Sequence, residues 1–332
     1  MSQVIRKAQP SIEQVHIDKP LTNISIAYIQ DSTEYVADEM FPSVPVSKRS
    51  DKYFVYDKND WLRDEAERRA DATETTGSGY NLSDDEYFCE VWGFHKDTGA
   101  QTVANEDDVL DAFTDATEFV TSKLLLRRER LFMENFVTST VWDTDRTGGA
   151  QGTNPDFVHW DDPVNSEPID YIAQQKRAIK GVTGKMPNTL LIGGEVWDYL
   201  RRHPDIIELV KYTQTAITLN PSLVAQALDI DKLVIAEAIY ATNEEGAATE
   251  TYSEIVGDEG LLAYVNPRPR LRQPSAGYIF PWRGYGGNNA YGVTVGRFFM
   301  DHLKATRIEG EMAFDMKVVG SDLGMYLSNI LS

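Results

Sequence analysis

The feature that most constrains the fold of this chain is the segment from Asn105 to about Val137, which contains neither glycine nor proline. Apolar residues recur in it every three or four positions and therefore share one face of a helix; they are Val109, Phe113, Ala116, Val120 and Leu124. Asn105 is the predicted N-cap, with acidic residues after it and basic residues toward the other end, as the helix dipole favours. At 1.5 Å per residue the helix is on the order of 50 Å long. Such a length is typical of a structural spine.

Charge is the most unusual property of the composition. The 332 residues carry a formal net charge of −20, with 52 acidic and 32 basic side chains. Affinity for nucleic acid comes largely from Lys and Arg that displace counterions, so sequence-specific binding of DNA or RNA is not expected. A protein that encloses nucleic acid without adhering to it is compatible with this charge. No signal segment and no membrane span of ~18 apolar residues is found in the sequence, so we expect a cytoplasmic protein.

Residues 1–45 are predicted to form an extended arm, because prolines interrupt the segment at four places. Within the arm, Asn23–Ile29 has the pattern of a short strand. The segment Ser32–Phe41 is predicted to be a short amphipathic helix that Ser32 or Thr33 caps.

Residues 46–100 are predicted to form a long β-hairpin with a polar tip. Its two strand-like runs are Lys52–Asp57 and Glu86–Phe94, and the stretch between them is polar and charged. Two paired strands alone are marginal in water because they have no core of their own. Either the hairpin lies on its own domain or a neighbouring molecule supplies the missing surface.

The rest of the chain mixes helices and strands. Residues 101–186 hold the spine helix and a second amphipathic helix that ends near Gly181. In residues 187–292 strands and helices alternate, which favours a compact α/β unit. Residues 293–332 are predicted to form two or three strands. The whole chain is therefore expected to have an α+β fold.

No set of residues in the sequence has the spacing of a catalytic, cofactor-binding or metal site. The strand–glycine–helix segment at Gly193 and Gly194 resembles a phosphate loop, but the spaced glycines are missing and Glu195 would repel phosphate. The loop from Asp143 to Asn154 imitates the start of a calcium loop and lacks the closing glutamate. The five histidines are scattered, and the single cysteine, Cys89, is expected to be a buried apolar group. We therefore expect neither enzymatic activity nor a cofactor.

Three stretches of the sequence resemble the major capsid proteins of tailed bacteriophages, which have the Hong Kong phage capsid fold. The most distinctive is GKMPNTLLIGGEVWDYLRRHPDIIELVKYT, which ends at Thr213 and is similar to the stretch that opens the axial domain of that family. PSAGYIFPW (Pro274–Trp282) resembles the family's late aromatic strand, and Arg307–Leu331 resembles its final peripheral strands.

The resemblance implies a partition into domains and a set of partners. The implied parts are an N-terminal arm (1–45), an extended hairpin loop (46–100), a peripheral domain with the spine helix (101–186), an α/β axial domain (187–292) and returning peripheral strands (293–332). The chain would assemble in the host cytoplasm into hexamers and pentamers of an icosahedral virion head that encloses double-stranded DNA. Implied partners are copies of the chain itself, neighbouring capsomers, a portal and a cement protein. Scaffolding is expected from a separate protein, because the arm begins without the helical segment that many relatives carry before it.

Contacts between subunits are expected at the hairpin tip, where side chains of both charges lie close together: Arg63, Glu65, Glu67, Arg68 and Arg69. Exposed pairs contribute about 0–1 kcal/mol each, so such contacts act through many copies. Some relatives join their subunits by an isopeptide bond between a loop lysine and an asparagine. Here Lys52 and Lys58 lie near the base of the hairpin and its tip carries only arginines, so no crosslinking is expected.

Two other interpretations of the sequence stay open. A shell protein of a bacterial nanocompartment has the same fold around a protein cargo, and the arm does not decide between it and a phage capsid. An acidic α/β metal-binding enzyme would use Asp143, Asp145 or the loop at Glu195, and would need the arm and hairpin to be ordinary loops. The oligomeric state separates the shell proteins from the enzyme.

Overall fold

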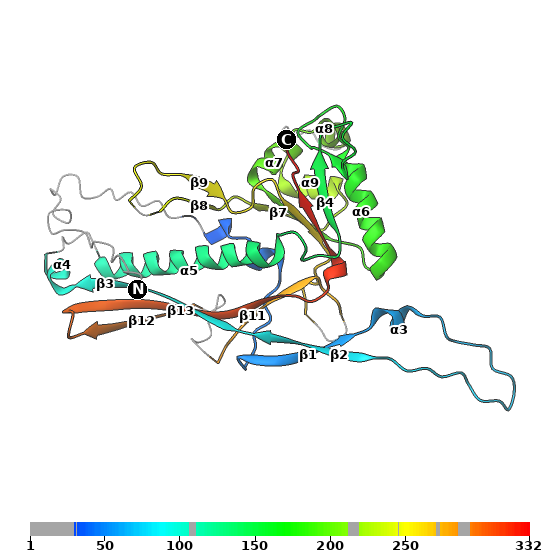
Figure 1. The fold of residues 1–332 in the computed structure, drawn as a ribbon, viewed down its shortest axis with the longest axis horizontal. Coiled ribbons are helices and arrows are strands. Elements are labelled where there is room, and N and C mark those ends of the chain that lie inside the picture. Colours follow the sequence, from blue (N-terminus) through cyan, green and yellow to red (C-terminus); the bar gives the residue numbers. More distant parts are fainter. Residues whose placement is uncertain are drawn as a thin grey trace.

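The computed structural model describes Gln30 and residues 32–105, 111–211, 219–244, 246–269, 273–284 and 293–332. Figure 1 shows an elongated molecule in which a long helix lies along a long sheet and a hairpin extends from one end of that sheet. A unit of helices around a second sheet stands above the middle of the molecule. The predicted strand Asn23–Ile29 lies outside the described residues.

The long helix is α5, Ala112–Phe136. Its N-cap is Asp111, whose side chain accepts hydrogen bonds from two backbone N–H groups of the first turn, at 3.0 and 3.2 Å. The predicted N-cap, Asn105, is wrong, because it follows the short helix α4, Ala100–Ala104, and residues 106–110 separate it from α5. The helix ends where the sequence predicts.

α5 packs on one face of an antiparallel sheet whose central strand is β13. The strands of this four-stranded sheet are β3 (Glu90–Gly99), β11 (Gly277–Pro281), β12 (Val293–Met300) and β13 (Ala305–Val318). Ile308 and Met312 of β13 share one core with Val120 of α5. Gly310 lies at the closest approach, since a Cβ atom there would lie 2.6 Å from Cγ1 of Val120. The close approach of α5 to β13 at this point therefore requires a glycine.

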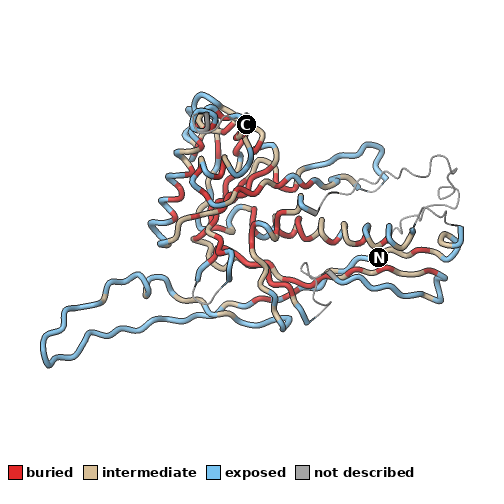
Figure 2. The backbone as a smooth tube through the Cα atoms, turned by 180° about the vertical axis from the view of Figure 1, so that it is seen from behind, coloured by how far each residue is buried: buried red, intermediate tan, exposed pale blue. Residues whose placement is uncertain are grey.

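The predicted hairpin is present, with one correction. β1 (Ser50–Tyr56) pairs antiparallel with β2 (Leu82–Phe88), and the short helix α3 (Lys58–Leu62) begins the connection between them. The predicted strand Glu86–Phe94 is wrong as a single element, because the chain changes partner at Cys89 and continues as β3 beside β13. We call residues 57–81 the hairpin loop; they are exposed along nearly their whole length (Figure 2).

The buried, apolar role expected for Cys89 is confirmed. Its side chain is 0% exposed, and its Sγ lies 3.3 Å from the backbone carbonyl oxygen of Phe280. Burial raises the pKa of the Cys89 thiol to about 12. A thiol with so high a pKa is not a nucleophile at neutral pH.

The second sheet has six strands in the order β5-β4-β14-β10-β6-β7. Their bounds are Asp145–Gly149 (β4), Phe157–Val158 (β5), Thr189–Gly193 (β6), Lys232–Ala236 (β7), Gly260–Ala263 (β10) and Gly324–Ser328 (β14). The helices beside it are α6 (Pro168–Thr183), α7 (Gly194–Leu200), α8 (Pro204–Lys211) and α9 (Pro221–Ala227). A second apolar core fills the space between these helices and the sheet.

Shorter elements complete the described fold. β8 (Ile239–Ala241) and β9 (Tyr252–Glu254) form a small hairpin that projects over α5 (Figure 1). The 3-10 helix η3 (Ser321–Leu323) joins β13 to β14. α6 ends two residues later than the sequence predicts, where Gly184 adopts the left-handed conformation with φ of 71°.

Strand pairing crosses the predicted domain ranges. β11 lies in residues 187–292 but pairs with β13, whereas β14 lies in residues 293–332 and pairs with β10 of the six-stranded sheet. β4, from residues 101–186, joins the same six-stranded sheet. The chain passes between the two sheets several times, so contiguous ranges do not describe them. As domain boundaries the ranges stay a prediction.

The arm enters the described part as two short helical segments, η2 (Ser32–Glu34) and α2 (Ala37–Met40), in place of the one helix predicted over Ser32–Phe41. Both predicted cap residues lie inside η2, and the N-cap residue of α2 is Val36, so the predicted cap is wrong. A valine has no side-chain acceptor, and another element therefore has to satisfy the first backbone N–H groups of α2.

Candidate assembly surfaces

The strand–glycine–helix segment is a packing element. β6 ends at Gly193, where an added Cβ atom would collide with the backbone carbonyl oxygens of Val256 and Gly257. The loop is thus closed by protein and is not open to a ligand. Burial, together with the charge of neighbouring carboxylates such as Glu195, raises the pKa of Glu254 near the start of α7. This negative surrounding disfavours phosphate.

One cluster resembles a serine-hydrolase triad in composition but not in hydrogen bonding. Oγ of Ser166 lies 2.9 Å from Nε2 of His203, and the carboxylate of Asp205 lies 3.6 Å from Nδ1. The backbone N–H of Asp205 donates to Nδ1 at 3.3 Å, so the ring proton is on Nε2. Nε2 therefore donates to Ser166 and cannot take its proton, as a catalytic base must.

The surroundings of this cluster support a structural role. The Ser166 hydroxyl donates to the backbone carbonyl of Asp162 at 2.6 Å. Ser166 and His203 are 4% and 2% exposed, and burial lowers the pKa of His203. A neutral, buried and fully hydrogen-bonded histidine stabilises packing.

Metal binding finds no support in the described ranges, where no group of three or more His, Cys, Asp or Glu side chains could hold an ion. Asp145, from the loop that imitates a calcium site, lies in β4 and accepts a hydrogen bond from the backbone N–H of Thr140 at 2.7 Å. None of the described helices is long and apolar enough to cross a bilayer.

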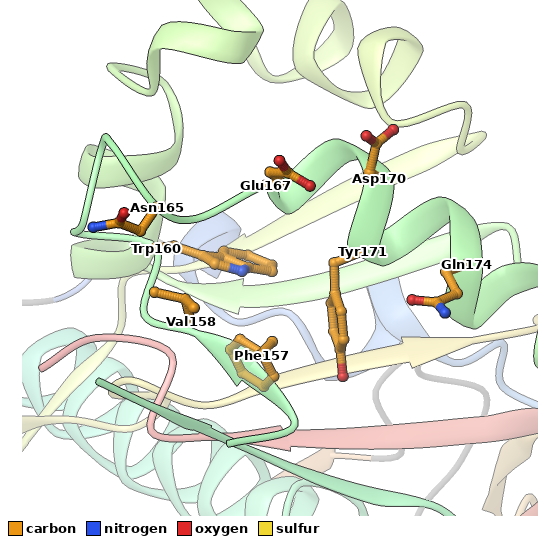
Figure 3. A pocket seen from close by; sticks show the side chains of 8 residues that line it. All are labelled: Phe157, Val158, Trp160, Asn165, Glu167, Asp170, Tyr171 and Gln174. Carbon is orange, nitrogen blue, oxygen red and sulfur yellow. The ribbon is translucent and has the colours of Figure 1, made fainter. Parts of the chain in front are cut away.

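A pocket of about 440 Å³ lies beside the start of α6 (Figure 3). It is lined by Phe157, Val158, Trp160, Asn165, Glu167, Asp170, Tyr171 and Gln174. The ring centroids of Phe157 and Tyr171 are 4.9 Å apart, and the carboxyl groups of Glu167 and Asp170 stand above the rings. These eight side chains include no nucleophile with an adjacent base, so the pocket offers no catalytic arrangement.

The predicted contact residues lie in the hairpin loop. The structure brings Arg63 and Glu65 together within one chain, at 2.8 Å, and Arg63 also lies 3.3 Å from Asp60. The guanidinium of Arg63 is therefore already paired with carboxylates of its own chain. Its contact with a second subunit stays a prediction.

The other three predicted residues are exposed and differ in their partners. Arg69 donates from Nε to the backbone carbonyl of Thr73 at 2.6 Å, and Glu67 accepts from a threonine hydroxyl of the loop at 3.2 Å. Arg68 forms no ion pair with any other residue that the structure describes. Of the five predicted residues, Arg68 is the most available to a neighbouring molecule.

Sequence reasoning missed an aromatic cluster at the base of the hairpin loop. The ring centroids of Tyr56, Trp61 and Tyr80 lie 5.9–6.0 Å apart. Trp61 and Tyr80 are 55% and 60% exposed, and Phe54 and Leu62 beside them are also exposed. A contiguous exposed apolar patch marks an interaction surface. The signal was the density of aromatic residues between Tyr53 and Trp61.

A second exposed apolar segment is β12, an edge strand of the four-stranded sheet. Among the described residues it pairs with β13 alone. Residues 294–299 are exposed, so both faces of the strand are open, and Phe298 and Phe299 are 46% and 54% exposed. Folded proteins normally guard such an edge or pair it with another strand.

The arm root, Val36–Phe41, is fixed to α5 by two consecutive helix residues. Arg128 forms two hydrogen bonds with the carboxylate of Asp38, at 2.6 and 2.5 Å. The next residue, Glu129, accepts hydrogen bonds from the backbone of the arm root. Arg128 and Glu129 are 3% and 2% exposed, which the sequence did not indicate. Arg128 and Glu129 thus bind the arm root to the spine helix α5.

Comparison with known proteins identifies capsid proteins. No known family profile matches the chain. The major capsid protein of Burkholderia phage BcepMu is 24% identical over 325 residues, which cover 95% of this chain and 96% of that protein. The major capsid protein of Pseudomonas phage JBD67 is 25% identical over 223 residues, 67% of this chain and 69% of that protein.

Solved structures share the fold over nearly the whole chain. A phage-related protein from Bordetella bronchiseptica RB50 superposes with a TM-score of 0.64 and 18% identity, covering 91% of this chain and 94% of that one. The capsid of cyanophage P-SCSP1u gives a TM-score of 0.58 with 9% identity, covering 97% and 95%. The SrpI encapsulin from Synechococcus elongatus gives 0.54 with 12% identity, covering 95% of both chains.

The fold of this chain, with its long helix on an antiparallel sheet, projecting hairpin loop and helix-flanked second sheet, is thus similar to these structures over nearly its whole length. The chain is therefore a structural shell protein with the Hong Kong phage-type capsid fold, and not an enzyme. Its curated relatives are major capsid proteins of phages, as the resemblance of three stretches of its sequence predicted, and this similarity places the chain in the shell of the virion.

Proposed function

We propose that the chain assembles into hexamers and pentamers that tile an icosahedral head around double-stranded DNA. The observation that carries this proposal is the hairpin loop, which projects beyond the rest of the described chain (Figure 1) and exposes both charged and aromatic side chains. A two-stranded ribbon alone is marginal in water. A neighbouring copy supplies the surface that the loop lacks, and a head-to-tail contact of this kind closes a ring.

Each predicted part has a role in this proposal. The arm (1–45) and the extended loop (46–100) reach neighbouring subunits, and α5 stiffens each tile. The peripheral domain combines residues 101–186 and 293–332, and the axial domain is residues 187–292, with the strand exchanges noted above. Arg63, Glu65, Glu67, Arg68 and Arg69 contact neighbouring subunits.

The charge of the chain fits a container for DNA. A net charge of −20 repels the phosphate backbone, so densely packed DNA slides along the inner wall and does not adsorb. The proposal includes a separate scaffolding protein, a portal and a cement protein as partners, in line with the resemblance to tailed-phage capsids.

The alternative is the shell of a bacterial nanocompartment. The similarity of fold to an encapsulin favours it, whereas the full-length similarity to curated phage capsid proteins favours the phage head.

Size-exclusion chromatography with negative-stain microscopy tests the proposal. Rings of five or six subunits, or closed particles, are expected at micromolar concentration. A monomer or dimer at every concentration contradicts the proposal. Nuclease-protected double-stranded DNA inside particles from infected cells supports the phage head, and a protein cargo without DNA supports the nanocompartment.

A further inference from the structure

Among the residues that the structure describes, none makes a glycine necessary at position 296 in β12. A Cβ atom added there would have only ordinary contact, with the backbone oxygen of Glu309 3.9 Å away. Gly310 in the adjacent strand differs, because a Cβ atom there would collide with α5. A glycine inside a strand weakens the strand and often marks a place where another backbone approaches closely. The described residues therefore give no reason for a glycine at position 296.

The surroundings of Gly296 are open and acidic. Its neighbour Arg297 lies over the ring of Phe113 of α5, 3.5 Å from the ring centroid, so Gly296 is on the opposite face of the sheet. On one side, Gly296 is paired with Glu309 of β13 in the strand register. On its other side is the free edge of β12. Glu309 forms no ion pair with another described residue. A carboxylate thus lies beside a strand edge with no side chain between it and the outside.

The hairpin loop carries a segment that fits this edge. Residues 63–70 form neither helix nor strand, and all but Glu65 are exposed. In an extended chain alternate residues share one side, which places Arg68 between Ala66 and Ala70. Arg68 forms no ion pair with another described residue. The carbonyl of Ala70 accepts hydrogen bonds from the backbone N–H and the hydroxyl of Thr73. The rest of the segment offers backbone groups for pairing and one arginine flanked by small residues.

The two surfaces cannot meet within one molecule. Figure 1 shows the hairpin loop and β12 at opposite ends of the elongated chain. A contact between them joins two copies head to tail, which is the type of contact that closes a ring.

We propose that residues 63–70 of a second copy pair as an added strand with the free edge of β12, and that Arg68 reaches Glu309 across Gly296. The inference rests on the proposed function and names the contact that assembly uses. Neighbouring strands are about 4.8 Å apart, so an added strand and β13 are separated by roughly 10 Å. Arginine and glutamate side chains together bridge that span where the residue between them has no side chain.

A valine at position 296 tests the backbone contact. Gly296→Val has room for its side chain and a higher strand propensity, so the isolated subunit keeps or raises its melting temperature, while assembly is lost. Gly93→Val is the matched control. Gly93 lies on the same face, on β3 at the opposite edge, and its Cβ would meet nothing closer than 3.7 Å. Gly93→Val should assemble as the wild type does, and a Gly296→Val variant that also assembles normally overturns the proposal.

A charge exchange tests the Arg68–Glu309 pair. Glu309→Arg and Arg68→Glu alone should each lower the particle yield, and the double variant should restore it. Arg63→Glu combined with Glu309→Arg is the control, because Arg63 is paired within its own chain, and this combination should not restore the yield. A double variant of Arg68 and Glu309 that stays as defective as the single variants contradicts the pair.

Hydrogen exchange separates this inference from the proposed function. Amides in residues 63–70 and 293–300 should exchange at least tenfold more slowly in particles than in unassembled subunits. If the wild type never assembles, the proposed function fails. If particles form but residues 293–300 exchange as fast as in the free subunit, only the β12 contact is overturned.

Discussion

The carboxylate of Glu129 caps α2 by accepting a hydrogen bond from the backbone N–H of Val36, 3.0 Å away. Its second oxygen accepts from the backbone N–H of Ala37 at 3.1 Å. Burial raises the pKa of Glu129 to about 7, although the two N–H groups and the neighbouring Arg128 act in the opposite direction. A titratable group thus holds the arm root on the spine helix.

The stability of the subunit should therefore depend on pH through Glu129. Between its ordinary pKa of 4.5 and the folded-state value of about 7, the folded chain binds a proton that the unfolded chain releases. The stabilisation is complete below about pH 4.5 and is lost as the pH rises to about 7, in total on the order of 3 kcal/mol at about 1.4 kcal/mol per pKa unit. Denaturant unfolding of unassembled subunits at pH 5 and pH 8 measures the loss. Glu129→Gln should lose less stability over this range, and an equal loss in both proteins contradicts the assignment.

The apolar face of α5 should tolerate truncation at its edge but not a charge at its centre. Val120 is 0% exposed, so Val120→Asp buries an unpaired carboxylate and should leave no soluble, folded subunit. Phe113 is only partly buried, and Phe113→Ala should fold with a loss of about 1–2 kcal/mol. Soluble expression and circular dichroism measure both outcomes. A folded Val120→Asp subunit means that the central face of α5 is not a core.

The sequence predicted the spine helix because its apolar stripe and its freedom from glycine and proline are local signals. The start of the helix was not predictable in the same way. Asn105 and Asp111 are both good N-caps, and only the tertiary structure selects Asp111. The break in the strand at Cys89 was also invisible, since the alternation of residues continues through it while the pairing partner changes.

The sequence alone did not predict which polar groups are buried or which glycines lie against a neighbouring element, and the structure was needed to show both. Arg128 and Glu129 read as ordinary surface charges of a helix, and only the packing of the arm root over them shows that they are buried. Gly296 and Gly310 lie in similar strand sequences, but α5 approaches one of them and not the other. Exposure of the hairpin loop, in contrast, followed from its composition. The sequence therefore predicted which segments are exposed. It predicted less reliably which polar residues are buried.

Arginines at the hairpin tip should contribute to assembly and not to folding. Arg68→Ala with Arg69→Ala should leave the melting temperature of the subunit unchanged, because both side chains are exposed, and should lower the particle yield. The loss relative to the wild type should be larger at low salt, because high salt screens the contacts that these arginines make in the wild type. Arg63→Ala is the control, since the guanidinium of Arg63 is engaged by Asp60 and Glu65 of its own chain, and its effect on yield should be smaller. A normal yield of the double variant across the salt range contradicts this role.

Covalent crosslinking between subunits should be absent. A lysine must lose its proton before it can attack an amide, and Nζ of Lys58 is engaged in an ion pair with the carboxylate of Asp322, at 2.5 Å. The next lysine is Lys96, and the arginines of the hairpin loop stay protonated. Asn329 is the only asparagine in residues 293–332.

Mature particles boiled in detergent should therefore run as one band near 37.4 kDa. A ladder of covalent multimers that persists under reducing conditions contradicts the prediction. In that case Lys58→Arg decides whether Lys58 is the nucleophile, because arginine keeps the ion pair with Asp322 but cannot form the amide bond. A ladder that disappears in Lys58→Arg would show that assembly breaks the contact with Asp322, and an unchanged ladder would exclude Lys58.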